Sequence, residues 1–501
     1  MGSPPVFPTI LEQAATGCNR RCARHRYLAG IVAAKPPSPR PCQGLLRSDA
    51  DNDIKRRQAM TRRKHAILGA LSALLPILAA CGGGGDGGID VAGGTVLQNA
   101  TVVNTRDGAL AAGMNVHVEG GKIRRITSQP LRATGGAQAI DVSGKYVVPG
   151  YLDMHAHAVE SADRDPPYWP LMIASGITGF REESDSPANV ERGKVLNQDS
   201  AAGRVLAPEV IFHGGEAHLN PAISARDASN AGAPSFDHLG AGWGLLMDCS
   251  SEEQTLRAAA LAGSLKPPFP PTFVTNPRAY DGAQNAPYYQ RILDTYDEAR
   301  CVELSKVFAK NGTWQTLTLI RLRTQVYGND PQYRDDPNLV YVDKSTRAIW
   351  QQVGDQFDKL PASAVTTLRQ FYELQKRVSK LMKQNGVKIM AGSDFSGNMS
   401  IWLVPGISLH QEFRELAAAG FSPLEVLQMA TRDPAEFLGR QSSLGSVEEG
   451  KDADLVVLDA NPLADVANLD RIRAVVLKGR YLSSSALDKM KADAAAAIAR
   501  Q

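Results

Sequence analysis

Two histidines stand two residues apart at the end of an apolar, strand-like run. His155 and His157 close the segment VVPGYLDMHAH, residues 147–157. Because side chains at positions i and i+2 of a strand lie on the same face, both imidazoles are expected to point the same way. Imidazole is a common ligand of zinc and related divalent ions. The pair alone is weak evidence for a metal site, since chance or packing also places two histidines at this spacing.

Three further side chains of ligand type end strand-like runs elsewhere in the chain. His218 is the second-last residue of GGEAHL, His238 ends APSFDH and Asp394 ends VKIMAGSD. One such coincidence means little. Four strand ends that carry only His or Asp favour a common metal centre, built from distant parts of the sequence.

The elements that must position these side chains alternate between strand and helix patterns over residues 147–439. Alternation over this length predicts an α/β fold, a (β/α) TIM-like barrel, in which side chains at the carboxyl ends of the strands meet on one face. A Pro- and aromatic-rich insert at 265–289 interrupts the alternation. Inserts of this kind often form lids or pocket walls.

Strand-rich segments flank the barrel region on both sides. Residues 95–146 and 440–482 alternate β-formers with turn residues. We predict that these two segments pair into one small discontinuous β-sandwich domain. The Ala-rich residues 483–501 are predicted to form a C-terminal surface helix.

The N-terminal part has the features of an export signal. Residues 60–80 have a basic start, a 15-residue apolar stretch and small residues before Cys81, the layout of a bacterial lipoprotein signal peptide. Cys81 is the predicted lipidation site and the Gly-rich 81–94 a flexible tether. A plain signal peptide and an uncleaved anchor helix are the alternatives. We expect an exported, membrane-anchored lipoprotein, at the outer membrane or in the periplasm if the source is Gram-negative. Residues 1–59 precede the initiator-like Met60 and are interpreted as a doubtful leader or a disordered extension.

Charge and cysteine content exclude some functions. The formal net charge of +3 comes from the first 80 residues, which hold 13 Lys and Arg against four acids. The remaining residues carry 42 basic and 48 acidic side chains without a basic run, so we expect no nucleic-acid partner. Of the six cysteines only Cys249 and Cys301 fall beyond the leader and lipidation site. Their spacing leaves a single bridge open and excludes a disulfide framework.

These motifs resemble the amidohydrolase superfamily of metal-dependent hydrolases, in particular its imidazolonepropionase-related and prolidase-like bacterial members. VVPGYLDMHAH resembles the first-strand motif, SFDHL the sixth-strand histidine motif and AGSD the eighth-strand aspartate motif. HLNPAISARDASNAG resembles the segment that begins with the fifth-strand histidine. MATRDPAEFLG followed by GSVEEGKDADLVVLD is similar to the passage from the last barrel helix into the small sheet domain. The resemblance covers most of residues 95–482.

The resemblance implies roles for single residues. The implied ligands of a divalent metal, zinc in the first place, are His155, His157, His218, His238 and Asp394. Asp394 and His238 would also act in catalysis. A divalent ion lowers the pKa of bound water toward about 7 and polarises a carbonyl. A carboxylate within hydrogen-bond reach then takes a proton and returns it to the leaving nitrogen.

The sequence departs from the family pattern between the third and fifth strands. Two-metal members carry a carboxylated lysine on the fourth strand that bridges both ions. The only lysine between His157 and His218 is Lys194, whose context reads as a solvated helix face. APEVIFHG runs almost directly into GEAHLNP, so roughly two β/α units are expected to be missing from a barrel shortened by an internal deletion. One ion is therefore favoured over two.

Several other side chains are candidates for the site. A one-ion centre needs only His155, His157, His218 and Asp394, with His238 on the water. The candidate substitute ligands or pocket residues are Glu216, which lies two before His218, His213 near the junction, His410 just past Asp394, and Arg321 or Arg323 as a partner of a substrate carboxylate.

The leading hypothesis is a metal-dependent amidohydrolase that acts on a small molecule with a non-peptide amide or dipeptide-like C–N bond. The first alternative is a catalytically impaired remnant or binding lipoprotein, because a barrel without a strand pair must close differently or expose an edge. The second alternative is a mononuclear deaminase.

Overall fold

The computed structural model describes residues 88–159, 168–184, 186–213, 219, 221–241, 243–266, 282–397 and 400–501. The chain divides into two units, Met1–Gly83 and Gly84–Gln501, and all described residues belong to the second. The expectations for the leader, the signal peptide and Cys81 therefore lie outside the described residues, as do those for His218 and Glu216. No helix within the described ranges is long and apolar enough to cross a membrane.

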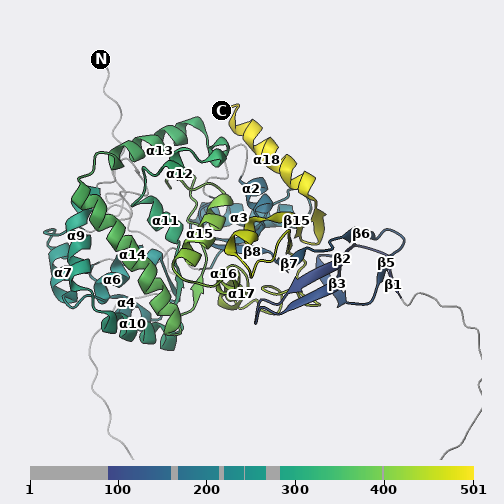
Figure 1. Cartoon of the computed structure of the whole chain (residues 1–501), viewed down its shortest axis with the longest axis horizontal. Helices are drawn as coiled ribbons and strands as arrows, with labels where there is room; N and C mark the ends of the chain where they lie inside the picture. The colour runs from purple at the N-terminus through teal and green to yellow at the C-terminus, as the bar shows by residue number, and fades with distance from the viewer. Residues whose placement is uncertain are drawn as a thin grey trace, which may run out of the picture. The chain divides into compact units, whose positions relative to one another are not determined.

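Strands from both ends of the described chain pair in one eight-stranded sheet (Figure 1). Its order is β16-β15-β14-β7-β2-β3-β4, with β6 beside β2. The two sequence segments meet where β14 pairs antiparallel with β7, in the register Val456 to Val148. A separate pair is formed by β1 and β5. The strands are β1 Ile89–Val91, β2 Thr95–Val103, β3 Leu110–Glu119, β4 Lys122–Thr127, β5 Leu131–Ala133, β6 Gln138–Asp141, β7 Tyr146–Pro149, β14 Leu455–Leu458, β15 Ile472–Leu477 and β16 Arg480–Leu482.

A second set of short parallel strands carries the predicted site. The orders are β10-β9-β8 and β11-β12-β13. Backbone bonds from Met154 N to Ala391 O (3.0 Å) and from Asp394 N to His155 O (2.8 Å) join β8 to β13 and its following residues. In the described chain these strands form one run with β10 and β11 at its two ends. They are β8 Tyr151–Ala156, β9 Ile177–Glu182, β10 Glu209–Ile211, β11 Ser235–Asp237, β12 Trp314–Thr316 and β13 Ile389–Met390.

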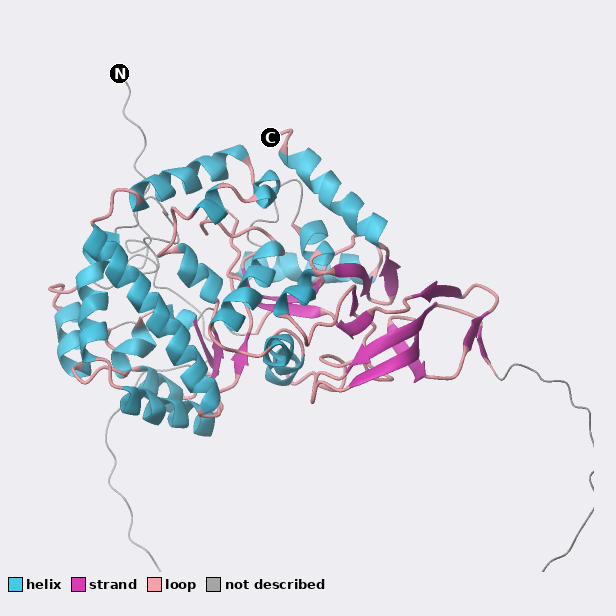
Figure 2. Ribbon diagram, in the orientation of Figure 1, coloured by secondary structure: helices cyan, strands magenta, loops and turns pink. Residues whose placement is uncertain are grey.

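Helices surround this strand run, as Figure 2 shows. Local sequence explains many of their ends: Asp297 caps the start of α10, Gly312 ends it with a left-handed φ of 71°, and Ser422 with Glu425 forms a capping box on α16. The helices are α2 Trp169–Ala174, α3 Pro187–Ala201, α4 Ala225–Asn230, α5 His238–Ala241, α6 Gly244–Asp248, α7 Glu253–Leu261, α9 Gly282–Thr295, α10 Glu298–Asn311, α11 Leu319–Thr324, α12 Pro331–Arg334, α13 Lys344–Phe357, α14 Ala362–Gln384, α15 Ile407–Ala418, α16 Pro423–Met429, α17 Arg432–Phe437 and α18 Ser484–Ile498, with 3-10 turns η2 Pro337–Tyr341 and η3 Val466–Asp470.

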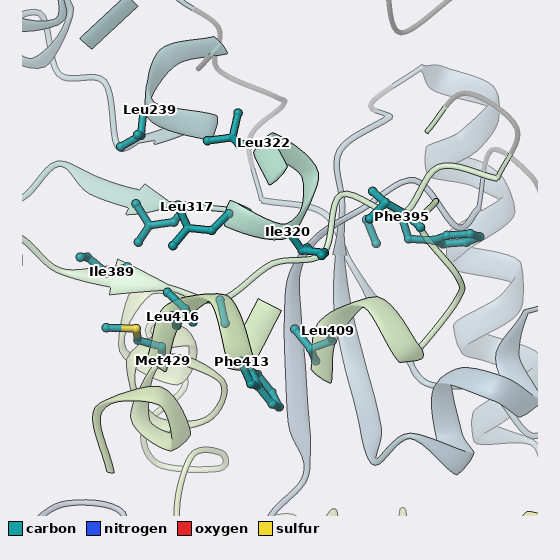
Figure 3. Packing of buried hydrophobic residues seen from close by; sticks show 14 of the residues in the cluster. Leu239, Leu317, Ile320, Leu322, Ile389, Phe395, Leu409, Phe413, Leu416 and Met429 are labelled. Atoms are coloured by element: carbon teal, nitrogen blue, oxygen red, sulfur yellow. The ribbon is translucent and has the colours of Figure 1, made fainter. Parts of the chain in front are cut away.

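The core behind the strand ends is a continuous apolar cluster. Figure 3 shows Ile320 of α11 among its members, together with Leu409 and Phe413 of α15 and Phe395, which follows β13. All four side chains are at most 3% exposed. Close packing of this kind fixes α11 and the segment after β13 relative to each other, because neither can shift without opening a cavity.

A disulfide joins Cys249 to Cys301, with the two Cα atoms 4.7 Å apart. It links the end of α6 to α10 and closes a loop that contains the insert. The structure therefore contains the single disulfide that the cysteine spacing left open. Both cysteines are buried, so the bridge belongs to the core.

Candidate metal centre

Three imidazoles surround one carboxylate at the ends of the parallel strands. His155 lies near the end of β8 and His157 directly beyond it, His238 follows β11, and Asp394 follows β13. The Nε2 atoms of His155 and His157 each lie 3.4 Å from Asp394 Oδ1, and His238 Nε2 lies 3.5 Å from Oδ2. The structure thus brings together four of the five predicted ligands, and the fifth, His218, lies outside the described residues.

The four side chains are withdrawn from solvent and two of them rest on unusual backbone. None of the four is more than 8% exposed. His238 has a φ of 53° and Asp394 a φ of 55°, a left-handed conformation that costs a non-glycine residue about 1 kcal/mol or more. Asp153 stabilises the Asp394 segment by accepting hydrogen bonds from Ser393 N (2.9 Å) and Ser393 Oγ (2.6 Å). Strained backbone held in this way is common at functional sites.

Each histidine uses its other ring nitrogen to contact the protein. His155 Nδ1 lies 3.2 Å from Asp237 Oδ1 and His157 Nδ1 lies 2.9 Å from Ser184 Oγ. The Nδ1 of His238 contacts the hydroxyl of Thr318. An acceptor at Nδ1 fixes the ring orientation and directs the Nε2 lone pair toward the centre. Metal-ligating histidines are held by the same arrangement.

The charges around Asp394 keep it ionised. Burial alone raises the pKa of its carboxyl, but the Arg321 guanidinium and the neighbouring imidazoles outweigh burial and bring the pKa well below its usual range. Burial likewise lowers the pKa of His155, yet Asp394 and Asp237 raise it well above normal. The negative charge of Asp394 favours positive charge on the surrounding imidazoles, and the same negative charge favours a bound cation.

The donor set fits a divalent ion of the zinc type. Ligand atoms of His155, His238 and Asp394 lie within 4.8 Å of one another, and all three side chains are buried. Three nitrogens and a carboxylate oxygen are ligands that zinc prefers. The residues therefore fit a divalent ion. Three imidazole Nε2 atoms converge on the buried carboxylate of Asp394, an arrangement that buried groups adopt when a cation balances them.

A second cluster of buried acids beside the centre is already neutralised. Glu183 and Asp237 also lie within 4.8 Å of a ring nitrogen of His155. However, Arg181 of β9 donates to Asp237 Oδ1 at 2.6 Å and contacts Glu183. Because the guanidinium supplies the positive charge there, we assign this cluster to the support of His155 rather than to an ion.

Two candidate residues do not join the centre. The exposed His213, a candidate substitute ligand, packs on Phe437 with tilted rings whose centroids lie 4.7 Å apart. His410 does not line the pocket as expected. It is buried in α15 against Tyr151, and its Nε2 lies 2.8 Å from the carbonyl oxygen of Ser175. Lys194 is solvated, as its sequence context predicts, and lies 3.7 Å from Glu191.

Sequence reasoning missed the charged residues that support the ligands. Arg181 and Glu183 lie in GFREE, and Asp237 directly precedes His238. Charged residues inside an otherwise apolar strand were the available signal, because such groups are buried only when paired. Arg321 was considered as a holder of a substrate carboxylate, but it contacts Asp394. Arg323 pairs with Glu415 at 3.2 Å, away from the centre.

The short helix α11 is held in place by a buried carboxylate of α15. Glu412 is fully buried, and its Oε2 accepts a hydrogen bond from Ile320 N at 2.7 Å. The side chain of Thr318, the N-cap residue of α11, makes no capping hydrogen bond. Glu412 thus replaces the missing cap and fixes the helix that carries Arg321.

We expect Glu412→Gln to change how stability depends on pH. Burial raises the pKa of Glu412 to about 8, although the backbone donors at Ile320 and Leu319 lower it. A carboxyl with a raised folded-state pKa gives its full stabilisation below its usual pKa and loses it as pH rises toward 8. The variant cannot ionise, so its free energy of unfolding should gain on wild type by up to about 1 kcal/mol per pH unit between pH 5 and 8. Urea unfolding at several pH values measures this. The control is Glu303→Gln on the surface of α10, and parallel curves for Glu412→Gln and wild type would contradict the expectation.

Comparison with known proteins finds similarity to amidohydrolases. The Amidohydrolase family model matches residues 375–482. The imidazolonepropionase of Thermoplasma acidophilum is 23% identical over 405 residues, which cover 74% of this chain and 89% of that protein. The adenine deaminase of Desulfatibacillum aliphaticivorans is 32% identical over 95 residues, 19% of this chain and 16% of that protein.

Solved structures agree in fold. A bottromycin amidohydrolase is similar with a TM-score of 0.54 and 17% identity, over 80% of this chain and 90% of that one. A prolidase complexed with N-methylphosphonate-L-proline has a TM-score of 0.48 and 22% identity, over 78% and 99%. The predicted α/β fold of the TIM-barrel type is confirmed at this level.

The match to the Amidohydrolase family model and the similarity to imidazolonepropionases over most of the chain support a place in the amidohydrolase superfamily. The chain is a hydrolase of carbon–nitrogen bonds, from a family whose members depend on metal.

Proposed function

We propose that the protein cleaves a non-peptide amide or dipeptide-like C–N bond of a small molecule, with water activated by one divalent ion, zinc in the first place. The observation that carries this proposal is the convergence of three histidine Nε2 atoms on the buried carboxylate of Asp394. The imidazolonepropionase relative, matched over 89% of its length, supports a small amide-like substrate.

The residues present define a sequence of proton transfers. When bound, the ion supplies a lowered water pKa and polarises the carbonyl. His155, His157 and Asp394 would hold it, since the Nε2 atoms of both histidines lie 3.4 Å from Oδ1 of Asp394. Asp394 takes the proton of the attacking water and passes it to the leaving nitrogen. Arg321 contacts Asp394 and keeps it ionised.

The shortened barrel is part of the proposal. β10 and β11 end the strand run, and only residues 212–234 connect them, too few for two further β/α units. The retained geometry at the other strand ends favours an active enzyme over an impaired remnant, because convergent buried side chains of ligand type are concentrated at functional sites.

We also propose export and lipidation at Cys81, on the signal-like sequence of residues 60–81. The Cys249–Cys301 disulfide supports this, since such bridges persist in oxidising compartments outside the cytosol. Mass spectrometry of the mature N-terminus from a bacterial host tests it. A diacylated Cys81 is the expected result, and an intact unmodified leader would contradict it.

A substrate screen tests the proposed activity. The full chain is stripped with a chelator, reloaded with zinc and offered N-acyl amino acids, Xaa-Pro dipeptides, cyclic imidazolone amides and adenine. We expect hydrolysis of one amide class that is lost on chelation and restored by zinc. Ammonia release from adenine alone would favour the deaminase alternative, which the adenine deaminase match over 95 residues supports. No turnover of any class, with zinc bound, would favour the binding-lipoprotein alternative.

A further inference from the structure

The two oxygens of Asp394 face different surroundings. Oδ1 lies 3.4 Å from the Nε2 atoms of both His155 and His157. Oδ2 lies 3.5 Å from His238 Nε2 and contacts Nε of Arg321. One side of the carboxylate therefore faces two imidazole nitrogens, while the other side already meets a fixed positive charge.

Arg321 is held in this position from several directions. It lies on α11, whose N-terminal amide at Ile320 is bound by Glu412. The hydroxyl of Tyr372 donates to the Leu319 carbonyl at 3.3 Å. The side chain of Arg321 is only 11% exposed. A guanidinium on so constrained a helix cannot swing away from Asp394 at little cost.

A second ion on the Oδ2 side would meet this charge directly. His238 Nε2 faces that oxygen at 3.5 Å, and the same oxygen contacts the guanidinium of Arg321. Between residues 168 and 213 the described chain offers no buried lysine to bridge two ions, since Lys194 is solvated. Repulsion between like charges at contact distance disfavours a cation there.

We propose that Arg321 takes the place of a second metal ion. Its guanidinium is the fixed positive charge on the Oδ2 side of Asp394, and the centre holds a single ion on the Oδ1 side. Arg321 acts as a positioning residue, because it works through its contact with Asp394. This inference rests on the proposed function.

Binding of Zn²⁺ to the metal-free full chain tests the inference, because the two possible roles of Arg321 predict changes of affinity in opposite directions. Isothermal titration with Zn²⁺ measures stoichiometry and Kd for wild type, Arg321→Met and Arg321→Lys. If Arg321 replaces a cation, Arg321→Met loses a repelling charge and binds Zn²⁺ about tenfold tighter or takes up a second ion. If Arg321 only orients a ligand, its loss weakens binding by about 10–100-fold. Arg321→Lys keeps the charge and is expected to stay within about threefold of wild type.

A matched control and a spectroscopic readout complete the test. Arg323→Met removes the partly buried second arginine of α11, which pairs with Glu415, and should leave Zn²⁺ affinity unchanged. Co²⁺ loading reports the coordination of the ion, and its visible spectrum should change in Arg321→Met but not in Arg323→Met. One ion in wild type with tighter or additional binding in Arg321→Met supports the proposal. Two ions in wild type, or unchanged or weaker binding in Arg321→Met, overturns it. A wild-type chain that is folded by circular dichroism and binds no ion overturns the proposed function as well.

Discussion

Asp394→Asn is expected to lower kcat by about 10²–10⁴-fold, the usual contribution of a positioned general acid and base. Asparagine has the same shape and keeps an oxygen toward His155 and His157, but it cannot accept a proton. The ion pair with Arg321 is lost as well. We therefore expect zinc to bind more weakly but not to disappear, while turnover falls far more than binding does.

Steady-state kinetics at saturating zinc measure this effect on whichever amide the screen identifies. The control is Asp297→Asn at the start of α10, because asparagine caps a helix about as well as aspartate. A kcat for Asp394→Asn within tenfold of wild type, with zinc bound, would show that another group carries the proton.

His155→Ala is expected to abolish tight metal binding and reduce hydrolysis to background. Its ring is fully buried and contacts both Asp394 and Asp237. Removing it deletes a ligand and leaves Asp237 without that donor, so a loss of stability of about 1–3 kcal/mol is also expected. His157→Ala removes a ligand from a slightly exposed position and separates the metal effect from the folding effect.

Zinc content after gel filtration and thermal unfolding of the stripped proteins measure both effects. His213→Ala is the matched control, since that histidine is exposed and packs on Phe437 outside the centre. If His155→Ala and His157→Ala both keep one tightly held zinc ion per chain, the assignment of the β8 histidines as ligands is wrong.

The ligands could be predicted from the sequence because they lie on strands or after strand ends, where strand geometry determines the direction of each side chain. His155 and His157 share a face because strand side chains alternate, and the residues after β11 and β13 meet them because parallel strands end on one side. Local rules of this kind need no knowledge of distant packing. For this reason His238 and Asp394 could be predicted as ligands from their positions at the ends of strand-like runs.

The same rules could not place residues whose direction depends on tertiary packing. His410 sits on a helix, and only the packing of α15 against Tyr151 turns it inward. Arg321 and Arg323 are neighbours on α11, yet one contacts Asp394 and the other Glu415. The contact of Arg181 with Asp237 likewise joins β9 to β11, two strands that are not adjacent in the sheet order.

A zinc-edge anomalous difference map from crystals of the zinc-loaded chain tests the central claim most directly. The account predicts one peak at about 2.0–2.2 Å from the Nε2 atoms of His155 and His157 and from Oδ1 of Asp394. A second peak beside His238 would contradict the inference about Arg321 alone. Zinc bound elsewhere, with no peak among these side chains, would contradict the metal centre itself.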